Sequence, residues 1–361
     1  MASSAGSTPT LGVEEEFLLV DPTTGAPVAL NRAVADRAAR DGVELQLELT
    51  SCQVETTSSV VDSATDLSDE LLRLRTVAAR AAEAAGAQLL AVGLPPTLPS
   101  QFPVTDTPRY RDIGDRFGMI AHEQGICGCH VHVAVPDRDA AIGVSNRLRP
   151  WLPLLLALTA NSAIYRNADT GHASWRSVLW ARWPSAGPPP QFASADEYDA
   201  AVEMLCHSGV IRDDGMVYWD VRPPRNFPTI EVRVADVPAT VAESVTFAAL
   251  VRGCVMTALE EHRRSEPVQP LAAFALKAAY WKAARDGLDG RNDFDDVLRI
   301  VAAHPSTGRH IAAKQHLTQE DQLLCQQDVL DLEALKLLPQ LLLQATLSDE
   351  LLEAMGYLRE W

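Results

Sequence analysis

The chain has 361 residues, of which 47% are hydrophobic and 22% are charged, a composition that supports one large or two modest globular domains. Its formal net charge of −17 disfavours nucleic-acid binding, because phosphate contacts depend on basic patches. The first 276 residues contain no lysine, which excludes a P-loop there, since that motif requires lysine. Any nucleotide phosphates would have to be bound by arginine or by metal ions.

The N-terminal segment 1–10 is small and polar and lacks both the basic and the apolar region of a signal peptide, so we expect a disordered tail. Six cysteines are too few for a disulfide scaffold and fit a reduced, cytoplasmic protein. No apolar run reaches membrane-spanning length, and the longest, 151–158, predicts a buried helix. We therefore expect neither a membrane nor a nucleic acid as partner.

The first predicted element is a strand at 11–20, where Val, Phe and Leu residues favour extended backbone. Alternation of apolar and polar residues predicts a second strand at 45–49. Leucine and alanine recur at helical spacing over 66–87, which predicts a helix. A short strand is expected at 88–93, before a pair of prolines ends it.

In the middle of the chain the pattern predicts a helix at 109–124, a strand at 126–135 and a mainly helical segment at 137–165. Residues 167–192 are rich in Trp, Gly and Pro and are predicted to form one long loop. Loops of this length inside compact domains are usually functional.

Two further strands are predicted at 218–222 and 229–234, and from residue 239 onward the pattern is almost entirely helical. Strands interspersed with helices, followed by a helical C-terminal third, indicate an α+β fold with an antiparallel sheet flanked by helices. We expect a single catalytic domain over 11–361.

Three adjacent carboxylates, Glu14, Glu15 and Glu16, interrupt the first apolar strand. Side chains alternate on a strand, so Glu14 and Glu16 share one face and Glu15 lies on the other. Two carboxylates about 7 Å apart on one face repel each other, and they need a cation, a proton or a partner.

The segment 127–133 holds two cysteines and two histidines, which suggests zinc. Alternation argues against a four-ligand cluster, because His130 and His132 share one face while Cys127 and Cys129 point the other way, as small core residues. The histidine pair suits a metal or a phosphate, and it equally suits a polar face with two exposed imidazoles.

Two other acid-containing segments are ambiguous when taken alone. Glu231 and Arg233 project from one face of the strand at 229–234, where a simple ion pair of low value is the favoured interpretation. Glu48 and Glu55 straddle a predicted bend, where carboxylates are more often solvated than ligating.

Several arginines lie in loops that suit small charged ligands. Arg176 and Arg182 could bind carboxylate or phosphate bidentately, or merely pin the long loop. Trp219, Asp220 and Arg222 form a mixture that fits either a ligand contact or an ordinary surface loop.

Taken together, these segments predict one sheet face that carries charged and imidazole groups: Glu14, Glu16, His130, His132, Glu231 and Arg233. Oxygen ligands predominate, which favours Mg²⁺ or Mn²⁺ over zinc. Several carboxylates around more than one divalent ion would allow a protein without a P-loop to hold the phosphates of ATP.

Six segments occur in an order that resembles one known family: LGVEEEF, CGCHVHV, DTGHASWR, WDVRP, TIEVRVAD and WKAARDGL. The set resembles the glutamate–cysteine ligase type 2 family, specifically its YbdK-like carboxylate–amine ligases, from about Thr10 to Gly290. The family's catalytic sheet is similar to that of glutamine synthetase. The resemblance implies that ATP and Mg²⁺ activate a glutamate-like carboxylate as an acyl phosphate, which a cysteine-like amine attacks to give an amide.

The resemblance also implies roles for individual residues. The implied metal ligands are Glu14, Glu16, Glu48, Glu55, His130 and Glu231. His132 would contact phosphate or substrate, and Arg233 would clamp the phosphoryl group or the substrate carboxylate. The implied lesser contacts to substrate or nucleotide are Arg176, Trp219, Asp220 and Arg222. Glu15 faces away and is expected to pair with a buried arginine.

Two other functions fit the same residues. A metal-dependent hydrolase of amides or phosphates would use the Glu and His face to activate water without ATP. A non-catalytic binding protein descended from a ligase should have lost a metal ligand, whereas every expected position holds a competent residue. An open sheet edge and apolar helices would permit a homodimer.

Overall fold

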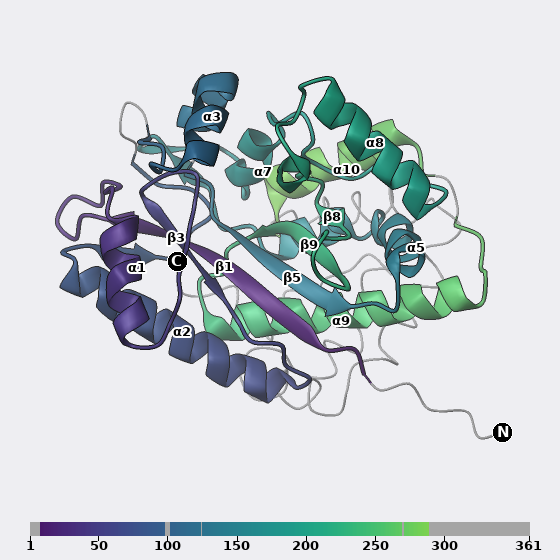
Figure 1. Cartoon of the computed structure of the whole chain (residues 1–361), viewed down its shortest axis with the longest axis horizontal. Coiled ribbons are helices and arrows are strands. Elements are labelled where there is room, and N and C mark those ends of the chain that lie inside the picture. Colours follow the sequence, from purple (N-terminus) through teal and green to yellow (C-terminus); the bar gives the residue numbers. More distant parts are fainter. Residues whose placement is uncertain (1–7, 98–101, 124, 269–270, 289–361) are drawn as a thin grey trace.

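Strand β1 (Leu11–Val20) forms as expected and lies at the centre of one antiparallel sheet. In this computed structural model, which describes residues 8–97, 102–123, 125–268 and 271–288, the sheet has seven strands in the order β2-β3-β1-β5-β9-β8, and β4 pairs with the end of β1. The other strands of the sheet are β2 (Gln46–Leu47), β3 (Gln53–Thr57), β4 (Gln88–Leu90), β5 (Gly128–Ala134), β8 (Val221–Arg222) and β9 (Thr229–Asp236). The predicted α+β class with an antiparallel sheet is confirmed (Figure 1).

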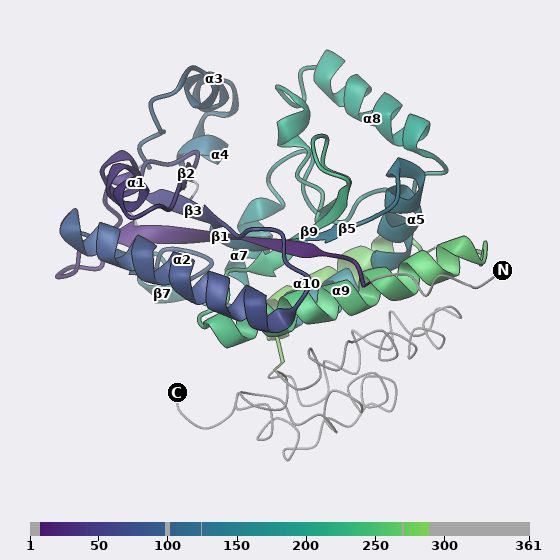
Figure 2. The same ribbon diagram turned by 60° about the horizontal axis from the view of Figure 1, so that its bottom comes forward.

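Helices lie on both sides of this sheet (Figure 2). The bounds of the α-helices in the described residues are α1 (Asn31–Arg40), α2 (Ala64–Ala84), α3 (Pro108–Phe117), α4 (Met119–His122), α5 (Arg138–Leu148), α6 (Leu152–Leu158), α7 (Trp175–Trp180), α8 (Ala195–His207), α9 (Val241–Arg263) and α10 (Ala273–Asp286). The long helices α2 and α9 run along one face, whereas α3 and α8 stand above the other face at its two ends (Figure 2). The site residues described below project from the face between α3 and α8.

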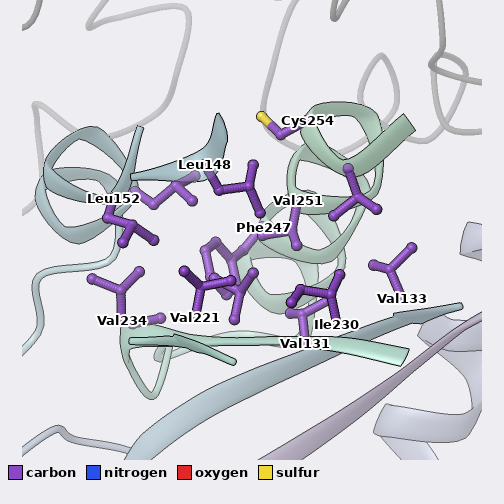
Figure 3. Packing of buried hydrophobic residues seen from close by; sticks show 14 of the residues in the cluster. Val131, Val133, Leu148, Leu152, Val221, Ile230, Val234, Phe247, Val251 and Cys254 are labelled. Carbon is purple, nitrogen blue, oxygen red and sulfur yellow. The ribbon is translucent and has the colours of Figure 1, made fainter. Parts of the chain in front are cut away.

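The main core lies between the sheet and α9. Val131 and Ile230 point from β5 and β9 toward Phe247 and Val251 of α9 (Figure 3). Cys129 is fully buried in the same cluster, which confirms the expected structural role of that thiol. Helix α9 is long and apolar enough to cross a membrane by length and composition, but 67% of its apolar window is buried inside the protein, as in a core helix.

Strands β5 and β9 pair with an irregularity in the middle. Cys129 lies opposite Ala235 and Val131 lies opposite Val232, so two residues of β9, Arg233 and Val234, stand opposite one residue of β5. This arrangement is a β-bulge, which re-aims side chains at the cost of local ladder bonds. It lies directly beside the histidines of β5.

Several predicted elements are divided by residues that break regular backbone. The helix predicted at 109–124 splits at Gly118, whose φ is 54°, and Gln124 lies outside the described residues. The helical segment predicted at 137–165 divides into α5 and α6 around Pro150, which cannot donate a helical hydrogen bond. The loop predicted at 167–192 was wrong in part, because it contains α7 and half of the small hairpin β6 (Ile164–Tyr165) and β7 (Ala168–Asp169).

Helix α1 and strand β3 are among the elements that were missed. Helix α1 starts after Leu30 without any side-chain cap, so the usual start signal is absent. Strand β3 is polar in sequence, yet four of its five residues are buried because it lies between β1 and β2. The expected helical C-terminal third is confirmed through α9 and α10, and residues 289–361 lie outside the described part of the chain, as do residues 1–7 of the predicted tail.

Candidate active site

The register of the sheet places the predicted ligands in adjacent cross-strand pairs. Glu16 of β1 lies opposite Glu55 of β3, and Glu14 lies opposite His130 of β5. Paired residues on neighbouring antiparallel strands share a face and lie within side-chain reach. Two polar residues that are far apart in sequence are thereby brought together in each pair.

Among the residues that the structure describes, two groups of three side chains could each hold a metal ion, and they share one imidazole. The first group is Glu14, His130 and Glu231, and the second is Glu16, Glu55 and His130. Within each group the potential ligand atoms all lie within 4.8 Å of one another. Carboxylates supply most of the donor atoms, a set that fits Mg²⁺ or Mn²⁺.

Glu231 is held in its ionised form, although it is only 1% exposed. Its Oε2 accepts a hydrogen bond of 2.7 Å from Nε of Arg222, and Oε1 is paired with Arg233. Burial alone would raise the pKa of Glu231, but the two guanidinium groups hold it well below its ordinary value. A permanently charged oxygen ligand therefore faces the histidines.

The two histidines of β5 contact the same glutamate. Nδ1 of His130 lies 3.2 Å from Oε2 of Glu14, and Nε2 of His132 lies 3.3 Å from Oε1. Burial opposes ionisation of Glu14, but the two nearby imidazoles lower its pKa. Burial and Arg233 lower the pKa of His130, which keeps this imidazole neutral and able to ligate a metal.

The pKa of His132 shifts in the opposite direction to that of His130. Burial alone would lower its pKa, but Glu14 and Glu231 raise it, so this ring is more readily protonated than His130. Its Nδ1 lies 3.3 Å from Oγ1 of Thr229, the first residue of β9, which orients the ring. A protonated imidazole at this position suits contact with phosphate or carboxylate.

The second group is a set of mutually repelling carboxyls. Burial raises the pKa values of both Glu16 and Glu55. The pKa of Glu55 is raised well above its ordinary value, because the negative charges of Glu48, Glu14 and Glu16 add to the effect of burial. Burial also raises the pKa of Glu48, which follows β2 and lies outside both ligand groups. A divalent cation would relieve this repulsion, so the donor set fits the metal implied by the family resemblance.

Two arginines are held rigidly beside the ligand groups. Nη1 of Arg233 lies 3.3 Å from Nδ1 of His130, and this guanidinium is only 8% exposed. Arg176 of α7 is buried with its Nη1 3.8 Å from Oδ1 of Asp236 and its Nη2 3.4 Å from the carbonyl oxygen of Arg233. Asp236 also accepts hydrogen bonds from Ser162 and Ser174, so the loop that carries Arg176 is tied to the end of β9.

Gly128 makes room for this arrangement. Its N–H donates a 2.6 Å hydrogen bond to Oε2 of Glu16. A Cβ atom on Gly128 would lie 2.4 Å from Nη2 of Arg176 and 3.1 Å from Nε2 of His130. The glycine that precedes the histidines therefore allows a guanidinium and an imidazole to approach the sheet closely.

The remaining predicted contacts fall in two places. Arg222 reaches the ligand groups through Glu231, as described above. Trp219 lies instead in a separate apolar cluster, packed against Phe192 and Tyr198. Asp220 is 4% exposed, and burial raises its pKa to about 6.

Glu15 lies on the other face of β1 and is fully buried. Its carboxylate accepts hydrogen bonds of 2.9 Å from Nε and 2.6 Å from Nη2 of Arg75, and a third from Ser244 of α9. The expected pairing of Glu15 with an arginine is confirmed. This ion pair joins β1 to α2 and α9 and belongs to the core.

A cavity of about 880 Å³ opens directly over the first ligand group. Its lining includes Glu14, His132, Arg222 and Glu231 from the sheet. The rest of the lining comes from α5, from α8 and from residues 213–227. A volume of this size suits a small-molecule substrate.

The sequence analysis missed the outer part of this cavity, because it made no prediction for residues 193–217. The sequence does contain a helix-start signal for part of this segment. The side chain of Ser194 accepts from the N–H of Glu197, and Glu197 reaches back to the N–H of Ala193, so the S-x-x-E pattern begins α8. That pattern predicts the helix but not its position above the sheet.

A family model described as glutamate–cysteine ligase family 2 matches residues 10–332. A protein from Mycolicibacterium vanbaalenii with the provisional name glutamate–cysteine ligase 2-2 is 82% identical over 282 residues, 78% of this chain and 77% of that protein. One from Mycolicibacterium smegmatis, provisionally glutamate–cysteine ligase 2-3, is 71% identical over 283 residues, 78% of each. One from Salinispora tropica is 48% identical over 298 residues, 82% of this chain and 78% of that protein.

Solved ligases share the fold at low sequence identity. A glutamate–cysteine ligase from Francisella tularensis, solved in complex with AMP, has a TM-score of 0.64 and 14% identity, covering 99% of this chain and 90% of that one. A bifunctional glutathione synthetase from Pasteurella multocida has a TM-score of 0.52 and 14% identity, covering 95% of this chain and 57% of that one. None of these proteins favours the hydrolase alternative.

Proposed function

Because the chain belongs to the glutamate–cysteine ligase family 2, we propose that it is an ATP- and Mg²⁺-dependent carboxylate–amine ligase that acts on a glutamate-like acid. The observation that carries this proposal is the pair of ligand groups that share His130, with Arg233 held 3.3 Å from that imidazole. The names of the relatives make cysteine the first amine to test.

The ligands would be Glu14, Glu16, Glu55, His130 and Glu231, and Glu48 is the further candidate because its charge interacts with that of Glu14. When bound, Mg²⁺ supplies charge neutralisation and alignment of the γ-phosphoryl group for in-line transfer. Phosphorylation of the acid is needed because a carboxylate and an ammonium ion do not condense readily in water.

Arg233 would stabilise negative charge on the transferred phosphoryl group, because its guanidinium is already fixed and costs no reorganisation. His132, which readily accepts a proton, would bind phosphate or substrate carboxylate at the floor of the cavity. The amine would enter through that cavity and attack the acyl phosphate.

A cytoplasmic location is part of the proposal. The cysteines among the described residues are free, and four of the five are buried, as expected for a protein of a reducing compartment.

The test is phosphate release from ATP with Mg²⁺ and glutamate while amines are added one at a time, cysteine first, with the products analysed by mass spectrometry. Release that requires both acid and amine, with a new amide mass, would establish the ligase. ATP turnover that is independent of the amine across a broad panel, with Mn²⁺ also tried, would count against it.

A further inference from the structure

The cavity over the sheet has an excess of negative charge. Six carboxylates and three guanidinium groups line it: Glu14, Asp199, Glu203, Asp213, Asp214 and Glu231, with Arg138, Arg222 and Arg225. No lysine lines it. Metal ions at the floor would compensate Glu14 and Glu231, but the carboxylates of α8 and of residues 213–214 lie on the outer wall.

The three guanidinium groups that line the cavity all have acidic partners. Each is already paired with an acid: Arg222 with Glu231, Arg138 with Asp199 and Arg225 with Asp214. A carboxylate on the amine, as in cysteine, would enter a cavity in which carboxylates outnumber guanidinium groups by six to three. Because the pairs of Arg138 and Arg225 are exposed, displacing them costs little, and the selection against such an amine comes from this excess of negative charge.

One carboxylate of the outer wall differs from the others because it is not compensated by a basic side chain in the described part of the chain. Glu203 of α8 is exposed and has no ion-pair partner among the described residues. Asp213, in contrast, is compensated by Arg109 and Arg212, neither of which lines the cavity. The free charge of the wall is therefore negative and is centred on α8.

The same cavity presents apolar surface. Phe227 is 61% exposed and its ring lies edge-on to His132, with 6.4 Å between the ring centroids. Val202 and Cys206 of α8 also line the cavity, as does Val217. A ligand of this cavity would thus meet apolar side chains as well as the carboxylate of Glu203.

We propose that the amine substrate is an alkyl diamine or polyamine, with no carboxylate and with a second positive charge near Glu203. This inference rests on the ligase function proposed above, and it replaces cysteine by a diamine or polyamine as the expected amine substrate. The free amino group attacks the carbonyl carbon of the acyl phosphate and forms the C–N bond. The C–O bond to phosphate breaks, phosphate leaves with the electron pair, and the amine nitrogen releases one proton.

The first test compares matched amines with the full chain, ATP, Mg²⁺ and glutamate. Cysteamine is cysteine without its carboxylate, and 1,4-diaminobutane is 1-aminobutane with a second amine. We expect kcat/KM to be about tenfold higher for cysteamine than for cysteine, and about tenfold higher for the diamine than for the monoamine, the size of one well-placed charge contact. Equal or reversed preferences in both pairs would overturn the proposal.

The second test uses Glu203→Gln, which removes the free charge with little change of shape. The ratio of kcat/KM for the diamine to that for the monoamine should fall about fivefold. Glu83→Gln, which changes an exposed glutamate on α2 far from the cavity, should keep the wild-type ratio. An unchanged ratio in Glu203→Gln would remove α8 from amine recognition and overturn the assignment.

Binding separates this inference from the ligase function itself. Calorimetric titration of 1,4-diaminobutane and of cysteine into the full chain, with glutamate and a non-hydrolysable ATP analogue present, needs no turnover. Diamine binding that weakens in Glu203→Gln, without ATP turnover, would support diamine recognition by α8 but would count against the ligase. Cysteine binding without diamine binding would overturn the inference and leave the ligase standing.

Discussion

Glu14 and Glu15 are adjacent in sequence, yet their carboxylates serve opposite faces of β1. Oε2 of Glu14 lies 3.2 Å from an imidazole of the candidate active site, whereas Oε1 of Glu15 lies 2.6 Å from a guanidinium nitrogen of Arg75 in the core. The same residue type at consecutive positions therefore faces the candidate active site in one case and the core in the other.

Glu15→Gln and Glu14→Gln should accordingly give opposite phenotypes. Glu15→Gln leaves the buried guanidinium of Arg75 without its carboxylate and should lower the free energy of unfolding by about 3 kcal/mol. Glu14→Gln should reduce turnover by about 100-fold or more while it changes stability little. Urea unfolding and steady-state rates of the two variants check this. If Glu15→Gln is the one that loses turnover at wild-type stability, the two faces have been assigned the wrong way round.

Gly128→Ala should impair turnover. The new Cβ would lie 2.4 Å from Nη2 of Arg176, so the guanidinium must move away from the ligand groups. We expect a loss of about tenfold or more in kcat/KM and about 1–3 kcal/mol of stability.

Gly12→Ala is the matched control on the same sheet face. Its nearest contact for a new Cβ is 3.6 Å, from Oγ of Ser58, which is ordinary van der Waals distance. We expect wild-type rates and stability for this variant. A Gly128→Ala enzyme as active as Gly12→Ala would show that Arg176 is dispensable for the site.

Metal binding should depend on His130 more than on any other single ligand. His130→Ala removes the donor that both ligand groups share, whereas Glu55→Gln affects only the second group. We expect His130→Ala to weaken all Mn²⁺ binding by about tenfold or more, and Glu55→Gln to weaken part of it. Titration followed by electron paramagnetic resonance measures both, and His207→Ala, an exposed imidazole on α8, is the control.

Arg233→Lys should lose activity although the positive charge is kept. The guanidinium contacts Glu231 and His130 together, and an ammonium group does not reproduce that planar geometry. We expect kcat to fall by about 100-fold. Arg263→Lys, at the exposed end of α9, should have the wild-type kcat. Equal kcat values for the two lysine variants would refute a specific role for the Arg233 guanidinium.

Asp220 should make stability depend on pH. Burial raises its pKa from 3.8 to about 6, so folding is favoured by the bound proton below pH 3.8, and this contribution is lost as the pH rises through about 6. Asp220→Asn cannot ionise and should be the more stable protein at pH 8, by at most about 3 kcal/mol, with the advantage shrinking toward pH 4. Urea unfolding at the two pH values tests this. An equal difference at both would mean that Asp220 does not titrate in this range.

The sheet face could be predicted from sequence because each of its pairs lies on a single strand. Alternation alone places Glu14 with Glu16, His130 with His132 and Glu231 with Arg233, and the structure brings all six together. Glu55 could not be placed in that way, because β3 is polar and is buried only by the strands on either side.

The cavity walls could not be predicted, because they depend on tertiary packing. Nothing in the local pattern of α8 indicates that Glu203 stands above a sheet formed by segments far away in the chain. Trp219 shows the converse error of local reasoning. A tryptophan beside Asp220 and Arg222 suggests a ligand contact, yet its ring fills an apolar cluster with Phe192 and Tyr198.

The bulge in β9 shifts the alternation of its side chains by one residue. Before the bulge, Glu231 and Arg233 lie on the site face. After it, Asp236, which lies opposite Gly128, is on the same face although its position is even-numbered. One strand thereby carries the proposed metal ligand Glu231, the proposed phosphoryl contact Arg233 and the ion-pair partner of Arg176, from both odd and even positions. Inserting or deleting one residue near Val234 would turn the side chains of half of the strand to the opposite face, so that core residues would face the site and site residues the core. The length of this segment therefore matters to the site as much as its side chains do.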